Sequence, residues 1–213
     1  MEKRWNELIN RLVNINKSNQ VNITFAYEIL RSDYAHYKRH YHTFDHIEYL
    51  LKDLDKYFSD LLSPKQKDLV ELAIWFHDID YDTKAPVGIN EKYSARRFEL
   101  FAHIIKLDKE TTKVIYDLII ATTHTKKQNT LMGKVICDLD LLGLAFTTEY
   151  FNNRTNVRKE YSEFNDNQWL EGRKKFLDWM IGKETIFQTG LFQKHFEQPA
   201  RDNLNIELKY FYV

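Results

Sequence analysis

The stretch that decides the fold begins with Ser63-Pro64-Lys65-Gln66 and ends with His77-Asp78. Ser63 can cap a helix, a proline suits the first helical position, and Gln66 completes a capping box. Apolar side chains then recur at helical spacing on one face, at Leu69, Leu72, Ala73 and Phe76. The stretch therefore predicts a helix with one buried face, and the His-Asp pair lies at its C-terminal end.

Outward from this stretch, the chain has few residues that interrupt helices. Only 3 prolines and 6 glycines occur in 213 residues, and such a composition favours long helices. A second capped helix is predicted to begin after Asp108 and to end near Thr123-His124. The other predicted helices cover residues 5–13, 23–37, 44–57, 91–105, 131–144, 148–164, 168–180, 186–196 and, after Pro199, 201–210.

The chain shows no sustained strand alternation and no internal repeat. The pattern therefore predicts an all-α helical bundle. A length of 213 residues can bury one substantial core, so a single domain covering residues 1–213 is expected.

Charge, apolar runs and cysteine content bear on nucleic-acid binding, on membrane insertion and on the compartment of the protein. The 31 basic and 31 acidic residues cancel and are spread along the chain, which argues against a dedicated nucleic-acid surface. The nearest approaches to basic clusters are Lys38-Arg39-His40 and Arg96-Arg97, interpreted as solvated helix surface. No apolar run is long enough for a membrane span, and no signal-peptide core follows the N-terminus. The single cysteine, Cys137, is interpreted as a small core residue, and a cytoplasmic protein is expected.

Three short blocks bring histidine and aspartate together. They read Tyr41-His42-Thr43-Phe44-Asp45-His46, Trp75-Phe76-His77-Asp78-Ile79 and Ile136-Cys137-Asp138-Leu139-Asp140-Leu141. A single histidine is more often a structural residue than a ligand. An aspartate in an apolar run, however, needs a cation or several donors close by. Because imidazoles and carboxylates form a mixed ligand set for a divalent metal, the three blocks together favour a metal site.

Two acids in the third block compete for the role of ligand. Asp138 and Asp140 are two positions apart, so on a helix their directions diverge by about 200°. Asp140 has small and apolar helical neighbours, whereas Asp138 has Lys134 one turn back as a surface partner. We therefore predict Asp140 as the inward-facing ligand, because an unpaired acid on an apolar face needs the metal more. Asp138 stays a candidate for orienting the ligands or binding substrate.

The order and spacing of the blocks resemble the HD superfamily of metal-dependent phosphohydrolases, whose domains are all-α. The first block also resembles the Tyr-His-x-x-x-His block of cyclic-nucleotide phosphodiesterases, although Thr43 stands where those enzymes usually have asparagine. Together with Asp80-Tyr81-Asp82, Asn90-Glu91 and Ser94, the blocks make most of the chain similar to one bacterial subgroup of predicted HD phosphohydrolases.

The resemblance implies a set of site residues. On their own, His42 and His46 share a helical face, so both could bind one metal, or one could face the substrate. The phosphodiesterase resemblance implies the second arrangement, with His42 as general acid and His46 as ligand. The implied ligand set is His46, His77, Asp78 and Asp140.

Further polar residues are expected near this site. The resemblance implies that Asp82, Asn90 and Glu91 orient ligands or water, while loop and helix capping explains them equally well. Tyr81 stands where cyclic-nucleotide phosphodiesterases place a histidine for a second metal. Of the two histidines left in the middle of the chain, His103 and His124, His124 is the better candidate for contacting a phosphate or a second ion.

The expected activity is hydrolysis of a small phosphorylated substrate or nucleotide. A water activated by a divalent ion (Mn, Mg, Co, Ni, Zn or Fe) would attack phosphorus, and His42 would protonate the departing oxygen. Arg39 would help to bind the phosphate or would be a surface residue. Two alternatives are a non-catalytic nucleotide- or metal-binding module and a di-iron oxygenase, and Tyr81 with the few other histidines counts against the oxygenase.

Overall fold

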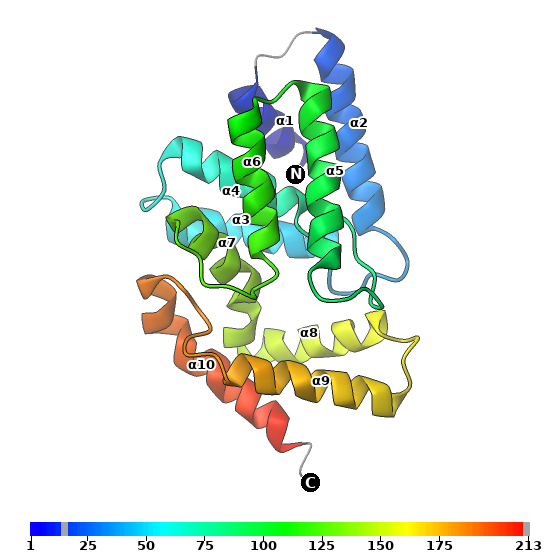
Figure 1. Ribbon diagram of the computed structural model, residues 1–213, viewed down its shortest axis with the longest axis vertical. Helices are drawn as coiled ribbons and strands as arrows, with labels where there is room; N and C mark the ends of the chain where they lie inside the picture. Colours follow the sequence, from blue (N-terminus) through cyan, green and yellow to red (C-terminus); the bar gives the residue numbers. More distant parts are fainter. Residues whose placement is uncertain (14–16, 211–213) are drawn as a thin grey trace. The chain divides into compact units, whose positions relative to one another are not determined.

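The computed structural model describes residues 1–13 and 17–210, and all regular structure within them is helical (Figure 1). The prediction of an all-α fold is confirmed for this part of the chain. The elements are α1 (Glu2–Leu12), α2 (Lys17–Tyr34), α3 (Phe44–Phe58), α4 (Pro64–Phe76), α5 (Ile89–Ile105), α6 (Lys109–Ala121), α7 (Leu131–Leu141), the short 3-10 helix η1 (Leu142–Ala145), α8 (Thr147–Glu160), α9 (Asp166–Ile181) and α10 (Gly190–Lys209).

The chain divides into two compact units, Met1–Ile136 and Cys137–Val213, with the boundary inside α7. The sequence-based prediction of one domain over residues 1–213 stays a prediction. Within the described ranges, no helix combines the length and the apolar character needed to cross a membrane.

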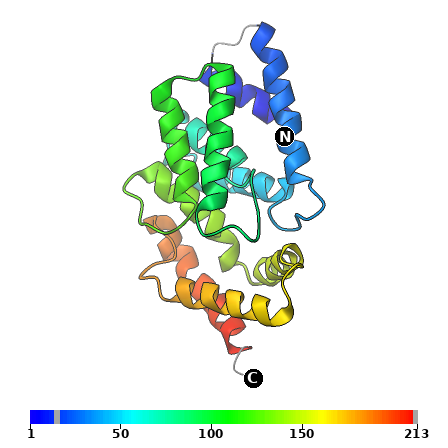
Figure 2. The ribbon, with the colours of Figure 1, turned by 45° about the vertical axis from the view of Figure 1, so that its right-hand side comes forward.

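Helix α4 is the centre of the first unit. Its start was predicted correctly, because the Ser63 hydroxyl accepts from the Gln66 backbone and the Gln66 side chain accepts from the Ser63 backbone. Its burial is more complete than the predicted single face, since every residue from 69 to 76 is buried. The reason is that α1, α3, α5 and α6 all contact this helix. Helices α5 and α6 run side by side in two views (Figures 1 and 2).

Aromatic side chains fill the core of the first unit. The fully buried rings of Trp5 and Trp75 meet edge to face, with centroids 5.4 Å apart. Phe101 lies 5.4 Å from Trp5 and stacks on Phe76 at 5.3 Å. This packing joins α1, α4 and α5, and it fixes the end of α4 from which the His-Asp pair follows.

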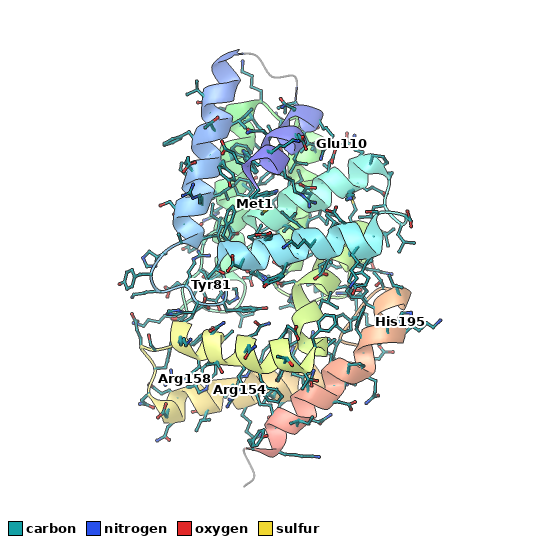
Figure 3. All side chains as sticks on the ribbon, turned by 180° about the vertical axis from the view of Figure 1, so that it is seen from behind. Met1, Tyr81, Glu110, Arg154, Arg158 and His195 are labelled. Atoms are coloured by element: carbon teal, nitrogen blue, oxygen red, sulfur yellow. The ribbon has the colours of Figure 1, made fainter. Side chains whose placement is uncertain are left out.

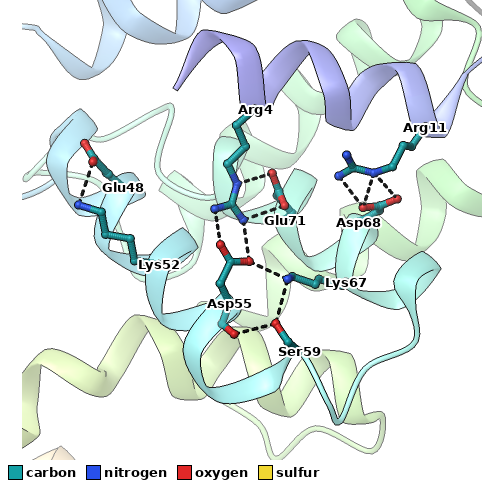
Figure 4. Close-up of polar contacts among 9 residues, drawn as sticks. All are labelled: Arg4, Arg11, Glu48, Lys52, Asp55, Ser59, Lys67, Asp68 and Glu71. Atoms are coloured by element: carbon teal, nitrogen blue, oxygen red, sulfur yellow. Dashed lines mark hydrogen bonds and ion pairs between the residues drawn. The ribbon is translucent and has the colours of Figure 1, made fainter.

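Glu71 is a buried acid on α4 whose charge is compensated by a helix far away in the sequence. The Arg4 guanidinium donates to both Glu71 oxygens at 2.8 and 2.9 Å and to both Asp55 oxygens at 2.7 and 3.2 Å (Figure 4). Lys67 also pairs with Asp55 at 2.7 Å. A buried carboxylate is costly without such a partner, so this network fastens α1 to α3 and α4.

Replacing Arg4 by alanine should therefore lower the free energy of unfolding by about 3 kcal/mol, the lower end for breaking a buried pair. Removing Arg4 leaves the Glu71 carboxylate without its arginine partner, although the Glu71 side chain is only 4 % exposed. Arg11→Ala is the matched control on the same helix, because Arg11 pairs with Asp68 in a more exposed setting (Figure 4) and should cost about 1 kcal/mol or less. Urea unfolding followed by circular dichroism measures both; equal losses would contradict this account of Glu71.

The second unit surrounds another buried acid, Glu207 of α10. Its carboxylate accepts from Arg154 at 2.7 Å and from Arg173 at 2.9 Å, and it also accepts from the Tyr150 hydroxyl. Arg154 projects from α8 (Figure 3). Burial acts to raise the pKa of Glu207, but hydrogen bonds and charge from Arg173 and its neighbours outweigh burial and lower that pKa. The network joins α8, α9 and α10.

Two predicted helix boundaries in this unit were wrong. The segments 186–196 and 201–210 were predicted as separate helices, but α10 is continuous from Gly190 to Lys209 with Pro199 inside it. A proline removes one backbone donor, and burial of Phe192, Ala200 and Leu204 keeps the helix together. Residues 186–189 are not helical, because their backbone N–H groups bind the carboxylates of Glu197 and Asp138 instead.

Smaller boundary differences occur elsewhere. Helix α2 covers Lys17–Tyr34 rather than 23–37, so residues 35–43 form a connection between α2 and α3. Helix α7 ends at Leu141 and continues as η1, and α8 ends at Glu160 rather than 164. The Asp108 cap was predicted correctly: its side chain accepts from the Thr111 backbone at 2.8 Å.

Candidate metal centre

His77 is positioned by the C-terminus of α4. The last carbonyls of a helix have no partner within the helix, and His77 Nδ1 lies 2.9 Å from the carbonyl oxygen of Ile74. Since a carbonyl only accepts, Nδ1 carries the proton of this hydrogen bond. The neutral ring therefore has its lone pair on Nε2, the form in which histidine binds metals.

Asp78 lies beside this nitrogen. Its Oδ2 is 2.9 Å from His77 Nε2, and its side chain is 13 % exposed. The same oxygen is 3.9 Å from Nε2 of His46, which is buried in the first turn of α3. The imidazole centroids of His46 and His77 are 5.5 Å apart. One carboxylate oxygen thus faces two imidazole nitrogens, one from α3 and one from the residue that follows α4.

These separations fit a single small cation. Ligand atoms about 2.1 Å from an ion stand about 3.0 Å apart at a right angle and about 4.2 Å apart on opposite sides. The separations of 2.9 and 3.9 Å from Asp78 Oδ2 agree with these values, and no two of the candidate donor atoms lie more than 4.8 Å apart. Two nitrogens and an oxygen suit Zn²⁺, Mn²⁺, Fe²⁺, Co²⁺ or Ni²⁺ by donor chemistry. The described residues therefore include a group that could hold a metal ion.

Asp140 is the fourth candidate ligand. It lies near the end of α7, after the boundary at which the second unit begins, and it is half-buried.

Asp138 was predicted to face the surface beside Lys134, and this prediction is wrong, because its side chain is fully buried. Its Oδ1 accepts from the Gln188 backbone at 2.6 Å, and its Oδ2 accepts from the backbone and hydroxyl of Thr189 at 2.8 and 2.6 Å. Asp138 therefore holds the segment that precedes α10.

Its neighbour Cys137 is buried as predicted, and burial raises the pKa of the thiol, which keeps it protonated at neutral pH.

His42 does not share a helical face with His46, because α3 begins only at Phe44. The chain bends before the helix, where the Thr43 backbone donates to Tyr41 at 2.8 Å. The bend still brings the His42 ring to 6.2 Å from the His46 ring. Tyr81, which projects from the loop after α4 (Figure 3), stacks on His42 with centroids 3.8 Å apart. Sequence reasoning missed this contact, because it considered Tyr81 only as a missing histidine.

Arg39 is half-buried and donates to three backbone carbonyls of the first unit. Its Nη1 lies 2.6 Å from Asp78 O and 3.1 Å from His42 O, and its Nη2 lies 2.6 Å from Ile79 O. The guanidinium also lies over the Tyr34 ring, 5.0 Å from its centroid. Arg39 was interpreted as solvated helix surface. This interpretation is wrong, since Arg39 lies outside a helix and its guanidinium is hydrogen-bonded to the backbone of the protein.

Among the remaining predicted residues, Asp82 and Asn90 have loop-capping contacts. The Asn90 side chain accepts from the Asp82 backbone at 3.0 Å and donates to it at 3.1 Å, and Asp82 Oδ1 accepts from the Lys84 backbone at 2.9 Å. Glu91 lies in the first turn of α5, where an acid is favourable. His124 follows α6 with a positive φ of 53° and is half-buried. These contacts are those of the loop-capping alternative for Asp82 and Asn90.

No family model matches the chain, and no curated protein or solved structure matches it either. The candidate metal centre is therefore supported by its own residues and distances.

Proposed function

We propose that the protein is a metal-dependent phosphohydrolase of the HD type. In this proposal His46, His77, Asp78 and Asp140 bind one divalent cation. The observation that supports it most is the proximity of three candidate ligands, two imidazoles and one carboxylate, with the His77 proton placed on Nδ1 by Ile74. Asp140 adds a second carboxylate, so that the four ligands carry two negative charges that a divalent cation neutralises.

The residues of the chain have separate tasks in the proposed reaction. A bound divalent cation supplies Lewis acidity and a water that is deprotonated near neutral pH. The His42 imidazole gives its proton to the departing ester oxygen. Stacking on Tyr81 at 3.8 Å keeps the His42 ring close to the ligands while leaving its nitrogens at the ring edge.

The proposal is tested by assaying nitrophenyl phosphate hydrolysis after adding Mn²⁺, Mg²⁺, Co²⁺, Ni²⁺, Zn²⁺ or Fe²⁺ separately to the metal-free protein. We expect turnover that depends on the metal. Metal binding without turnover of this ester or of a panel of phosphorylated metabolites and nucleotides would instead indicate a non-catalytic module, and failure to bind any of the six ions would overturn the proposal.

Substitutions of Asp138 and Asp140 should have different effects, one on stability and the other on metal affinity. Asp140→Asn should weaken Mn²⁺ binding by more than about 100-fold, which exceeds the usual loss for an outer partner of a ligand, and should change stability little. Asp138→Asn should lower the free energy of unfolding by about 1–3 kcal/mol, because it disturbs buried hydrogen bonds, while Mn²⁺ affinity stays unchanged. Calorimetric titration and thermal unfolding measure the two quantities. Equal losses of affinity would mean that Asp140 is not the specific ligand.

A further inference from the structure

The carbonyls at the end of α4 are each bound by a specific donor. Ile74 O is bound by His77 Nδ1, Trp75 O by the Tyr34 hydroxyl at 3.2 Å, and Phe76 O by the Ile79 backbone at 3.2 Å. Beyond His77, the carbonyls of Asp78 and Ile79 are bound by Arg39 at 2.6 Å each. The carbonyls on both sides of His77, at residues 74–76 and 78–79, are thus held by specific donors.

Arg39 connects this backbone to the first histidine block. The nitrogen that donates to Asp78 O also donates to His42 O at 3.1 Å. A guanidinium is planar, permanently charged and able to donate along several directions at once, so it can hold two chain segments in one geometry. A positive charge just beyond a helix C-terminus is also favourable, and the Tyr34 face adds a cation–π contact at 5.0 Å.

We infer that Arg39 is a positioning residue, which sets the distance between the proposed ligand Asp78 and the proposed proton donor His42. It acts on the metal centre through the backbone of these two residues and does not bind the substrate phosphate. This inference rests on the proposed function, because it assumes that Asp78 binds a metal.

A positioning role for Arg39 can be distinguished by measurement from two alternatives, which are binding of the substrate phosphate and a purely structural role. Without Arg39, the Asp78 backbone would exchange its fixed donor for water, and the carboxylate would be held less precisely relative to His77. Metal affinity should then fall. A phosphate-binding arginine would instead change KM and leave metal affinity intact, and a purely structural arginine would change stability alone.

The chain offers a matched control in Arg201. Its guanidinium also donates to three backbone carbonyls, those of Ile181 at 3.0 Å, Lys183 at 2.8 Å and Glu184 at 3.1 Å. Arg201 belongs to the second unit and is absent from the candidate metal group. Arg201→Ala therefore removes the same kind of contact, together with an ion pair to Glu197 at 2.8 Å, without touching the proposed ligands.

The experiment compares Mn²⁺ affinity by calorimetric titration, together with thermal unfolding, for the parent protein, Arg39→Ala, Arg39→Lys and Arg201→Ala. We expect Arg39→Ala to raise the Mn²⁺ dissociation constant by about 10–100-fold, the usual effect of removing an outer partner of a ligand. Arg39→Lys should give an intermediate dissociation constant, because a lysine ammonium cannot reproduce the geometry in which the planar guanidinium binds the carbonyls of Asp78 and Ile79. Arg201→Ala should lower the Tm but leave the dissociation constant within about twofold, well below the effect of an outer ligand partner.

Added methylguanidinium at millimolar concentration should restore part of the Mn²⁺ affinity of Arg39→Ala and none of that of His77→Ala. If Arg39→Ala does not fold, the dissociation constant of Arg39→Lys decides the question. Unchanged Mn²⁺ affinity in the Arg39 variants would overturn the inference, whether KM or stability changes instead. A parent protein that binds no Mn²⁺ or other divalent ion would overturn the proposed function itself, so the two failures are distinguishable.

Discussion

Replacing Asp78 by asparagine is expected to abolish retention of a divalent cation and, with it, any phosphoesterase activity. Asp78 Oδ2 is the atom that both His77 Nε2 and His46 Nε2 face, at 2.9 and 3.9 Å. Asparagine keeps the shape of the side chain but removes the charge that attracts the ion. The loss of affinity should exceed the roughly 100-fold caused by replacing an outer partner of a ligand. Metal content after gel filtration and calorimetric titration with Mn²⁺ measure it.

Asp80→Asn provides the control for this substitution. Asp80 is two residues further along the same loop and is paired with Arg97 at 3.7 Å, outside the candidate metal group. Burial raises the pKa of Asp80, so its neutral analogue should be tolerated. We expect metal content close to that of the parent protein. An Asp78→Asn variant that holds metal as well as the Asp80→Asn variant would contradict the assignment.

Replacing His42 by alanine should leave metal content nearly intact and slow turnover of an unactivated phosphate ester by about 10²–10⁴-fold, the usual contribution of a positioned proton donor. The loss should be smaller for nitrophenyl phosphate, whose leaving group needs little protonation. Steady-state rates on the two esters, with metal analysis of the same samples, measure the effect.

His36→Ala is the control for His42, because His36 is an exposed histidine in the same connection between α2 and α3. Its substitution should change neither rate nor metal content. If His42→Ala loses its metal, His42 is a ligand rather than a proton donor. If it changes neither quantity, the imidazole has no part in the reaction.

Local signals in the sequence predicted the helical fold well. The Ser63–Gln66 capping box and the Asp108 cap depend on residues within one turn, so the sequence states them directly. The apolar spacing after Ser63 correctly predicted that His77 follows the end of a helix. The order of the histidine and aspartate blocks led us to expect His46, His77, Asp78 and Asp140 on one ion. The structure contains such a group, which could hold a metal, and the binding itself stays a prediction.

Features that depend on distant partners were not predictable in this way. Asp138 is buried because backbone donors 50 and 51 residues further along the chain bind it, and nothing near Lys134 indicates those donors. Pro199 usually indicates a helix end, yet α10 continues through it because Ala200 and Leu204 are buried by tertiary packing. Arg39 looked like one member of a basic cluster, and only the folded chain brings it to the carbonyls of Asp78 and Ile79.

The most direct test of the metal centre is a crystal structure of the protein grown with Mn²⁺, with anomalous scattering used to locate the ion. The account predicts one strong peak about 2.0–2.3 Å from His46 Nε2, His77 Nε2 and a carboxylate oxygen of Asp78, with Asp140 as a further ligand. The absence of a peak at these atoms, or a peak held by other residues alone, would contradict it.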